Sequence, residues 1–368
     1  FITTAASAMR FPSELIMGIG TPAGGRLSLH AITQSDLIIL LGTRINFMLG
    51  FGKPPFISST QKIIQVDVEP SELGQYREVD IGVAGDIKEV LKCWNAEIKK
   101  PACPSSWPEK LIKERTRFQK ELNPLLSSSN IPIHPLRLIK EIEDARTEDS
   151  FMVLDGSNSA LWAVLGIRPR SEGQVLFSPI GDLEAIGAGI PHAMALKLHY
   201  PEREVILHTG DGSFGFCAME FETAVREKIP IVAVVHNDGA WGMTRDMQVE
   251  FYGRDRQIGN TLGPVRYDLM VKAMGGHGEF VEKPEEIRPA LKRALSSGLP
   301  ACVNVIVDPE PKSPGLMIWI LMEVLLGKKT YLDKIPDIMR RLKDWHLDSP
   351  VLSIMRKQME AKIHRKMG

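Results

Sequence analysis

The sequence lacks a net charge, a cysteine pattern and a long apolar run. Its 45 Lys and Arg balance 45 Asp and Glu, which argues against nucleic acid as the main partner. The four cysteines form no close pair and no metal-ligand spacing, so a reducing, cytoplasmic setting is expected. The most apolar segment, Leu316 to Leu326, contains Glu323 and is too short to span a bilayer.

The chain also lacks an initiating methionine and a signal peptide, since it begins with Phe1. We therefore expect it to be a piece of something longer. With 368 residues, of which 43% are hydrophobic and 24% charged, it has the composition of an ordinary globular protein of two or three domains.

The most informative stretch runs from Glu204 to Met243. An apolar run from Val205 to His208 is followed by the turn Thr209-Gly210-Asp211-Gly212-Ser213. A helical pattern comes next, with apolar residues at Met219, Phe221, Ala224 and Val225, and a second apolar run, Ile231 to Val235, leads to Asn237. This order predicts a βαβ unit whose two strand ends carry polar groups to one edge of a parallel sheet, where α/β sheets bind ligands.

The turn residues suit a diphosphate and its metal ion. Gly210 and Gly212 let the backbone approach a ligand closely, and the N–H groups of the helix that follows Ser213 attract phosphate. A hard cation such as Mg²⁺ takes oxygen ligands, which the Asp211 carboxylate, the Asn237 amide and the Gly239 carbonyl can supply. The alternative is an ordinary strand-ending turn, because Gly and Asp are common in turns.

This Gly-Asp-Gly…Asn arrangement resembles the thiamine diphosphate (ThDP) motif. Two earlier blocks, GTRINFMLGFGKPP from Gly42 and IIQVDVEPSELG from Ile63, resemble the central domain of the acetolactate synthase superfamily. The similarity is greatest to its 2-hydroxyacyl-CoA lyase and oxalyl-CoA decarboxylase branch. It extends from about Ser35 to Pro309.

The residue patterns and the resemblance together predict an α/β fold with four parts. Residues 1–100 would form part of a Rossmann-like central domain, and a proline-rich linker would occupy 101–132. A doubly wound parallel-sheet domain that binds the ThDP diphosphate would occupy 133–310. Residues 311–368, with 12 Lys and Arg against 6 Asp and Glu, would form a basic helical tail that covers the active-site mouth, mediates assembly or is simply a solvated face.

Further site residues follow from the resemblance. The turn Gly156-Ser157-Asn158 would make a second diphosphate contact, and Ile186 would prop the thiamine rings in their bent conformation. Trp241 and Met243 would line the substrate pocket. Alternatively, the turn only joins a strand to a helix, and the apolar side chains belong to the core.

In the central domain, Arg44 would pair with the phosphates of FAD or ADP, and Asp67 and Asp86 would lie near the adenosine. The alternatives are a surface ion pair for Arg44 and a helix cap for Asp86.

The expected activity is that of a ThDP- and Mg²⁺-dependent lyase or carboligase (transferase), a homo-oligomer acting on a 2-oxo acid or 2-hydroxyacyl-CoA. In the superfamily, a Glu from a pyrimidine-binding domain contacts the aminopyrimidine ring. We find no such domain here, and Glu184, Glu220 and Glu222 are not substitutes, so it is expected upstream in the same chain or on another polypeptide. The alternative is a non-catalytic or partner-dependent ThDP-binding chain.

Overall fold

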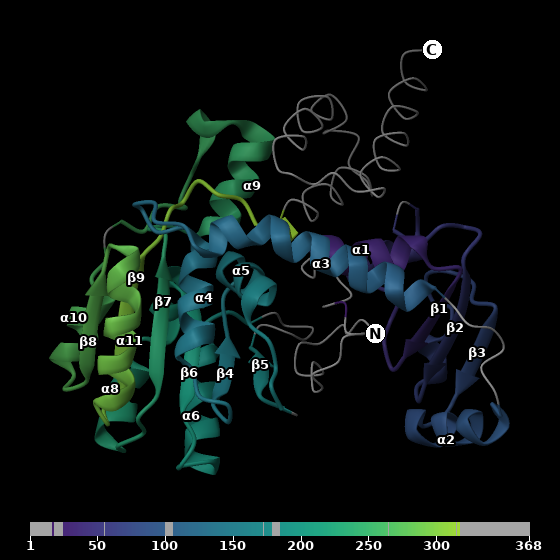
Figure 1. Cartoon of the computed structure of the whole chain (residues 1–368), viewed down its shortest axis with the longest axis horizontal. Coiled ribbons are helices and arrows are strands. Elements are labelled where there is room, and N and C mark those ends of the chain that lie inside the picture. The colour runs from purple at the N-terminus through teal and green to yellow at the C-terminus, as the bar shows by residue number, and fades with distance from the viewer. Residues whose placement is uncertain are drawn as a thin grey trace. The chain divides into compact units, whose positions relative to one another are not determined.

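The computed structural model describes residues 17, 25–54, 56–99, 106–171, 173–178, 185–263, 265–313 and 315–316. They fall into two compact units (Figure 1), with described parts in Met17–Arg117 and Phe118–Leu316. The boundary lies within helix α3 (Trp107–Leu126). Residues 317–368 of the predicted helical tail lie outside the described residues.

The first unit is built on a three-stranded parallel sheet in the order β1-β2-β3. Asp86 ends the loop after β3 and begins the last helix of the unit. The elements are α1 (Gly25–Gln34), β1 (Leu37–Leu41), η3 (Phe47–Gly52), β2 (Lys62–Asp67), η4 (Pro70–Glu72), β3 (Ile81–Ala84) and α2 (Ile87–Glu97).

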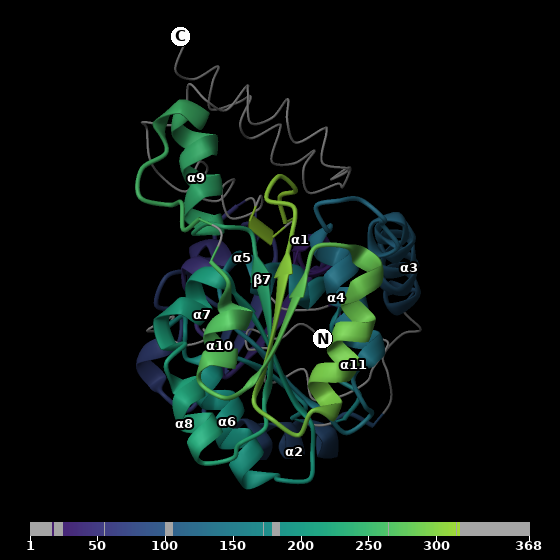
Figure 2. The ribbon, with the colours of Figure 1, turned by 90° about the vertical axis from the view of Figure 1, so that its left-hand side faces the viewer.

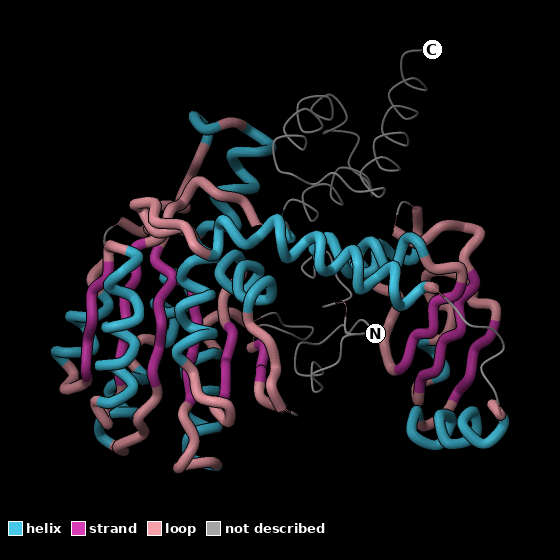
Figure 3. The backbone as a smooth tube through the Cα atoms, viewed as in Figure 1, coloured by secondary structure: helices cyan, strands magenta, loops and turns pink. Residues whose placement is uncertain are grey.

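The second unit contains a six-stranded sheet in the order β5-β4-β6-β7-β9-β8, in which every neighbouring pair is parallel (Figure 3). Parallel strands all end at the same edge of a sheet, so the turns after β4, β6 and β7 lie together. The strands are β4 (Phe151–Leu154), β5 (Val175–Phe177), β6 (Val205–Gly210), β7 (Val232–Asn237), β8 (His277–Val281) and β9 (Ala301–Ile306).

Helices cover both faces of this sheet (Figure 2), as the doubly wound fold predicts. Along β7, Val232 and Val234 pack into one core, while Ala233 and Val235 pack into the other. The first core receives α4 (Pro135–Ala145), α5 (Asn158–Gly166) and α11 (Ile287–Ser296); the second receives α6 (Gly189–His199), α7 (Asp211–Cys217), α8 (Glu220–Arg226) and α10 (Tyr267–Ala273). The remaining helices of the unit are α9 (Gly242–Tyr252), η5 (Arg254–Arg256) and η6 (Pro284–Glu286).

The predicted helix after Ser213 differs from the observed one. The chain becomes helical at Asp211, and two short helices, α7 and α8, replace one continuous helix. Because the chain is redirected between them, Met219 is 63% exposed, whereas Phe221 and Ala224 are buried as predicted.

The chain reverses its winding between β4 and β6. These strands are neighbours, yet β4 leads into α5 on one face and β6 leads into α7 on the other. Diverging connections open a crevice at the carboxyl ends of the two strands, which is where open α/β sheets bind ligands. The fold thus places the turns after Leu154 and Gly210 on the two sides of one crevice.

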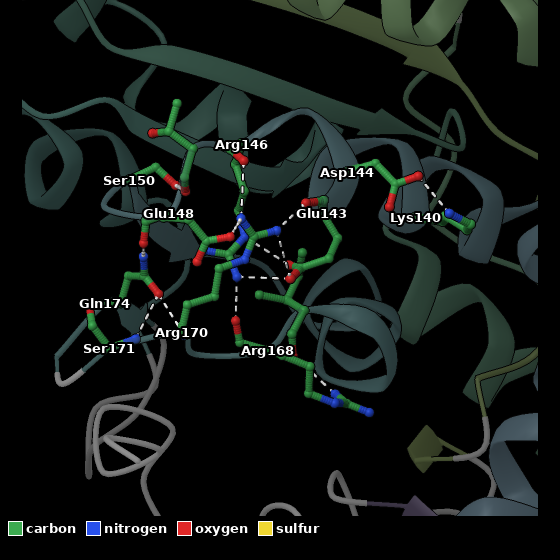
Figure 4. Close-up of polar contacts among 12 residues, drawn as sticks. Lys140, Glu143, Asp144, Arg146, Glu148, Ser150, Arg168, Arg170, Ser171 and Gln174 are labelled. Carbon is green, nitrogen blue, oxygen red and sulfur yellow. Dashed lines mark hydrogen bonds and ion pairs between the residues drawn. The ribbon is translucent and has the colours of Figure 1, made fainter. Parts of the chain in front are cut away.

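A cluster of charged side chains lies at the opposite edge of this sheet, where its strands begin (Figure 4). The fully buried side chain of Arg146 binds both carboxylate oxygens of Glu143, at 2.8 and 2.9 Å, and the carbonyl of Arg168. Arg170 also contacts Glu143, and its backbone N–H donates to Gln174 at 2.6 Å. These bonds fasten the end of α4 to the loop that leads into β5.

No helix in the described ranges combines the length and the apolar character needed to cross a membrane.

Candidate active site

The carboxylate of Asp211 is at the centre of the candidate site. It is the first residue of α7, directly after β6, and its side chain is buried. One oxygen accepts from the N–H of Gly212 at 2.8 Å, and the other accepts from the N–H of Ala240, after β7, at 3.1 Å. Burial, with the nearby Asp238 carboxyl, raises the pKa of Asp211 to about 8. A cation at this carboxylate would favour its charged form.

Asp238 is the acidic neighbour that sequence analysis did not single out. Its carboxylate forms an ion pair with Arg245 at 3.3 Å and accepts from the N–H of Ala240 at 3.3 Å. Burial raises the pKa of Asp238, whereas the guanidinium of Arg245 lowers it. Two carboxyl groups therefore lie close to the same turn, which makes this part of the edge suited to positive charge.

The amide of Asn237 has a fixed orientation. Its Nδ2 donates to the carbonyl of Val265 at 3.2 Å and to Asn304 Oδ1 at 3.0 Å. Its Oδ1 accepts from the N–H of Gly239 at 3.1 Å. Both hydrogens of Nδ2 already have acceptors, so the amide oxygen is the atom that faces the turn after β7. Its second lone pair can bind a metal ion.

The carbonyl of Gly239, the third predicted metal ligand, is engaged elsewhere. It accepts from the N–H groups of Leu262 at 2.9 Å and Gly263 at 3.3 Å. A carbonyl oxygen has two lone pairs, so it could bind a cation only by giving up one of these bonds. Its role as a ligand stays a prediction that requires this exchange.

The two predicted diphosphate turns meet. Gly156 follows β4 with a φ of +91°, and a side chain there would come within 3.1 Å of Ser213 Oγ and 3.2 Å of the Gly210 nitrogen. Only glycine can take this conformation and leave room for the neighbouring turn. Ser157 begins α5 without a side-chain cap, and Asn158 is its first residue. Backbone N–H and hydroxyl groups from both turns thus line one small region.

The turn that carries Ile186 is tied to the same crevice through Asp155. This fully buried carboxylate accepts from the N–H of Gly187 at 3.1 and 3.2 Å and from the N–H of Gly189 at 3.1 Å. A side chain on Gly187 would also meet the carbonyl of Ser213 at 3.2 Å. Ile186 is therefore held close to the start of α7.

Trp241 lies over the backbone of Gly212. A Cβ atom on Gly212 would come within 2.6 Å of the indole ring, and the ring centroid of Phe216 lies 5.3 Å from that of Trp241. Both Trp241 and Met243, which is the second residue of α9, are half-buried. Trp241 therefore lies against the Gly-Asp-Gly turn, and its role in a substrate pocket stays a prediction.

The three predicted nucleotide residues lie at the carboxyl edge of the other sheet. Arg44 follows β1 and is exposed, while Asp67 is the last residue of β2. Asp67 Oδ1 accepts from the N–H of Glu69 at 3.0 Å. Asp86 caps α2 by accepting from the N–H of Glu89 at 3.2 Å, so the helix-cap alternative describes its observed contact. A nucleotide role for these residues stays a prediction.

Sequence analysis missed three acids of this region: Asp155 and Asp246, which are buried, and Asp238, which is partly buried. Asp155 directly follows an apolar strand, as Asp211 does, and this shared position was the available signal. The neighbouring Arg245 is one partner of Asp246, but nothing in the sequence near Asp246 indicates the other two, because they lie in α5 and in the segment after β9.

The residues present suit a phosphate ester with a divalent cation. The oxygen donors Asp211 and Asn237 lie beside the N–H and hydroxyl groups of the two turns. Hard cations prefer carboxylate and amide oxygens as ligands, and phosphates bind to N–H and hydroxyl groups. Among the described residues, no group of three or more His, Cys, Asp or Glu side chains could hold a metal ion. A cation site here would therefore need the amide or carbonyl oxygens.

Two sequence-family models match the chain. Residues 155–305 match the C-terminal TPP binding domain of thiamine pyrophosphate enzymes, and residues 2–93 match their central domain. TPP is ThDP, and the first match begins at Asp155 and spans Asp211 and Asn237.

Three relatives illustrate the similarity. The chain is 35% identical to the acetolactate synthase large subunit IlvG of Mycobacterium tuberculosis, over 80% of this chain and 53% of the relative. It is 32% identical to a 2-hydroxyacyl-CoA lyase of Oryza sativa subsp. japonica, over 76% and 50%. It is 28% identical to the oxalyl-CoA decarboxylase of Escherichia coli, over 76% and 49%.

The chain thus spans about half the length of the curated relatives it matches. Fold, site and matches agree on one assignment: the chain belongs to the thiamine diphosphate-dependent enzymes of the acetolactate synthase superfamily, and it carries their central and C-terminal ThDP-binding domains.

Proposed function

We propose that the chain takes part in a ThDP- and Mg²⁺-dependent C–C bond lyase or carboligase reaction on a 2-oxo acid or a 2-hydroxyacyl-CoA. The observation that carries this proposal is the convergence of Asp211, Asn237 and the Gly156 turn at the carboxyl edge of one sheet. The relatives support the substrate class, since their names include an acetolactate synthase, a 2-hydroxyacyl-CoA lyase and an oxalyl-CoA decarboxylase.

In this proposal, Mg²⁺ is held by the Asp211 carboxylate, the Asn237 amide oxygen and the Gly239 carbonyl. The diphosphate is bound by the turns Gly156-Ser157-Asn158 and Gly210–Ser213. When bound, ThDP supplies an electron sink for the breaking or forming of a C–C bond. The chain itself holds and orients the cofactor, and it neutralises the charge of the diphosphate.

Two further roles concern the space beside the cofactor. Ile186, held by the Asp155-bound turn, supplies the apolar bulk under the thiamine rings. Trp241 and Met243 line the substrate pocket, and the indole of Trp241 also shields the Gly212 turn from water. Removing water strengthens every electrostatic contact in such a site.

The group that acts on the aminopyrimidine ring is a Glu of a pyrimidine-binding domain, supplied upstream in the same chain or by another polypeptide in a homo-oligomer. The half-length match to the relatives supports this assignment. The competing proposal is a ThDP-binding chain that is not catalytic. We also propose FAD or ADP as the ligand of the first unit, because Arg44, Asp67 and Asp86 share one sheet edge.

The decisive experiment is calorimetric titration of the chain with ThDP and Mg²⁺. Asp211→Ala removes a metal ligand at a strand end, so ThDP binding should be lost while the circular dichroism spectrum is kept. The exposed carboxylate of Asp255 provides a matched control, since Asp255→Ala changes the net charge equally and should bind normally. Unchanged affinity in Asp211→Ala would refute the assignment.

Exchange of the ThDP C2 proton, followed by NMR, separates the catalytic from the non-catalytic proposal. On this chain alone, exchange should run near the rate of free cofactor. Adding a Glu-bearing pyrimidine domain should accelerate it by about 10²-fold or more, as a positioned acid/base group does. No acceleration would favour the non-catalytic chain, and fast exchange without a partner would place the catalytic carboxylate within this chain.

A further inference from the structure

A fully buried carboxylate on α9, Asp246, joins three segments of the second unit. Its Oδ1 accepts from Arg245 Nε at 3.1 Å and from the ammonium group of Lys312. Its Oδ2 accepts from Asn158 Nδ2 at 3.1 Å. Asn158 belongs to the first diphosphate turn, and Lys312 belongs to the segment after β9, so Asp246 connects the turn to a part of the chain that follows the sheet.

The contacts of Asn158 fix which way its amide faces. Nδ2 donates to Asp246, while Oδ1 accepts from Ser313 Oγ at 3.2 Å. An amide that is turned over would place its oxygen against the Asp246 carboxylate, which only accepts, so Asp246 decides the orientation; the Ser313 hydroxyl can both donate and accept. One hydrogen of Nδ2 remains for another acceptor at the turn.

The charges around Asp246 balance. Arg245 lies between Asp246 and Asp238, at 3.0 and 3.3 Å, and Lys312 supplies the second positive charge. Arg245 also donates to the carbonyl of Pro309 at 2.8 Å, next to the segment that carries Lys312. A buried carboxylate without these cations would repel a diphosphate, but paired in this way it can orient Asn158 without adding net negative charge.

We propose that Asp246 is a positioning residue for the diphosphate cofactor: it aims the Asn158 amide N–H at the phosphate, with Lys312 and Ser313 holding the arrangement from the segment after β9. This inference rests on the proposed function. It adds that the segment Lys312–Ser313, which belongs to none of the sheet's strands or helices, contributes to cofactor affinity without contacting the cofactor.

A double-mutant cycle on the full chain, with ThDP·Mg²⁺ affinity measured by calorimetry, tests the proposal. Asn158→Ala removes a hydrogen bond to a charged group, so affinity should fall about 10-fold or more. Asp246→Leu/Lys312→Met replaces the ion pair by apolar groups without changing the net charge, and it should cause a similar loss. In the Asn158→Ala background, the same pair of changes should cause no further loss, because the residue through which they act is gone.

Two results would overturn the proposal: wild-type affinity in the double replacement, or losses that multiply when all three changes are combined. If the double replacement does not fold, Ser313→Ala takes its place: it removes the contact to Asn158 Oδ1 and the acceptor of the Leu316 N–H, and it keeps the ion pairs of Asp246. It should weaken binding in the wild-type background and have no effect in Asn158→Ala. Equal losses in both backgrounds, or none, would also overturn the proposal.

The same measurements distinguish a wrong cofactor assignment from a wrong positioning role. If neither the wild type nor any variant binds ThDP, the proposed function itself is wrong. If the wild type binds, Asp211→Ala does not, and the Asp246 and Ser313 variants bind like the wild type, only the positioning role is wrong.

Discussion

The Asp155 carboxylate accepts hydrogen bonds from the backbone N–H of Gly187 through both of its oxygens, at 3.2 and 3.1 Å. The two residues belong to different turns, one after β4 and one before α6. Asp155 also accepts from the N–H groups of Gly156 and Gly189, at 2.6 and 3.1 Å, so one buried side chain satisfies three backbone donors. The position of Ile186 therefore depends on the carboxylate that binds the N–H of the next residue, Gly187.

Asp155→Asn should loosen this turn. An amide keeps one acceptor and turns a donor toward other donors, so we expect a loss of about 2–4 kcal/mol in the free energy of unfolding, together with weaker ThDP binding. Urea unfolding and amide hydrogen exchange at Gly187 and Gly189 measure the effect. Thr209→Val is the matched control: it removes the longest contact to Asp155, at 3.4 Å, and a weak contact to the Gly210 carbonyl, at 3.3 Å, and it should cost much less. Equal losses in the two variants would contradict the prediction.

The charged cluster at the amino edge offers a second matched pair (Figure 4). Glu143→Gln removes the charge that pairs with the fully buried Arg146, and we expect a loss of about 3 kcal/mol. Glu148 pairs with Arg170 but is 85% exposed, so Glu148→Gln should change stability by less than about 1 kcal/mol. Thermal and urea unfolding of both variants measure this difference. Equal losses in the free energy of unfolding would contradict the prediction.

Two buried histidines should make the protein sensitive to acid. Burial lowers the pKa of His208 to about 3, and it lowers the pKa of His236 well below its ordinary value. Below pH 6.5, the unfolded chain binds protons at these positions and the folded chain does not, so stability falls as pH falls. Each histidine should contribute about 1.4 kcal/mol per pH unit.

His208→Leu tests this acid sensitivity. It should flatten the decline in unfolding free energy between pH 6.5 and 4.5, measured by urea titration at several pH values. The side chain of His208 is completely buried, and neither ring nitrogen has a hydrogen-bond partner. An unchanged pH dependence in the variant would show that other groups cause the decline.

The nucleotide prediction for the first unit is tested by thermal shift. ADP or FAD should raise the melting temperature of the wild type but not of Arg44→Ala, because a planar guanidinium after a strand can bind a phosphate pair. An equal shift in both proteins would remove Arg44 from the site. No shift in either would argue against nucleotide binding by this unit.

Most of the scaffold could be predicted from the sequence. The short apolar runs Val205 to His208 and Ile231 to Val235 located β6 and β7 to within about two residues. These elements are specified by local patterning, so the sequence alone defines them. The break between α7 and α8 was not predicted, because the apolar periodicity continues through Met219 while the chain turns.

The sequence predicts the candidate site residues that lie at strand ends, because that pattern is local, and it misses contacts between segments that are distant in the chain. Gly156, Asp211 and Asn237 each follow a strand, and parallel topology alone brings them together. The partners of Asp246 could not be predicted, because Asn158 and Lys312 come from segments far away in the chain. Likewise, the occupied carbonyl of Gly239 depends on the conformation of the loop at Leu262.

The contact between Gly212 and Trp241 has a consequence for the divergence of related chains. A side chain at position 212 would come within 2.6 Å of the indole ring, so position 212 cannot hold a larger residue while tryptophan occupies position 241. We expect the two positions to covary among homologues, with any residue larger than glycine at 212 accompanied by a smaller one at 241. Under the proposed function, a change of substrate range at position 241 would thus be constrained by the turn proposed to bind the cofactor.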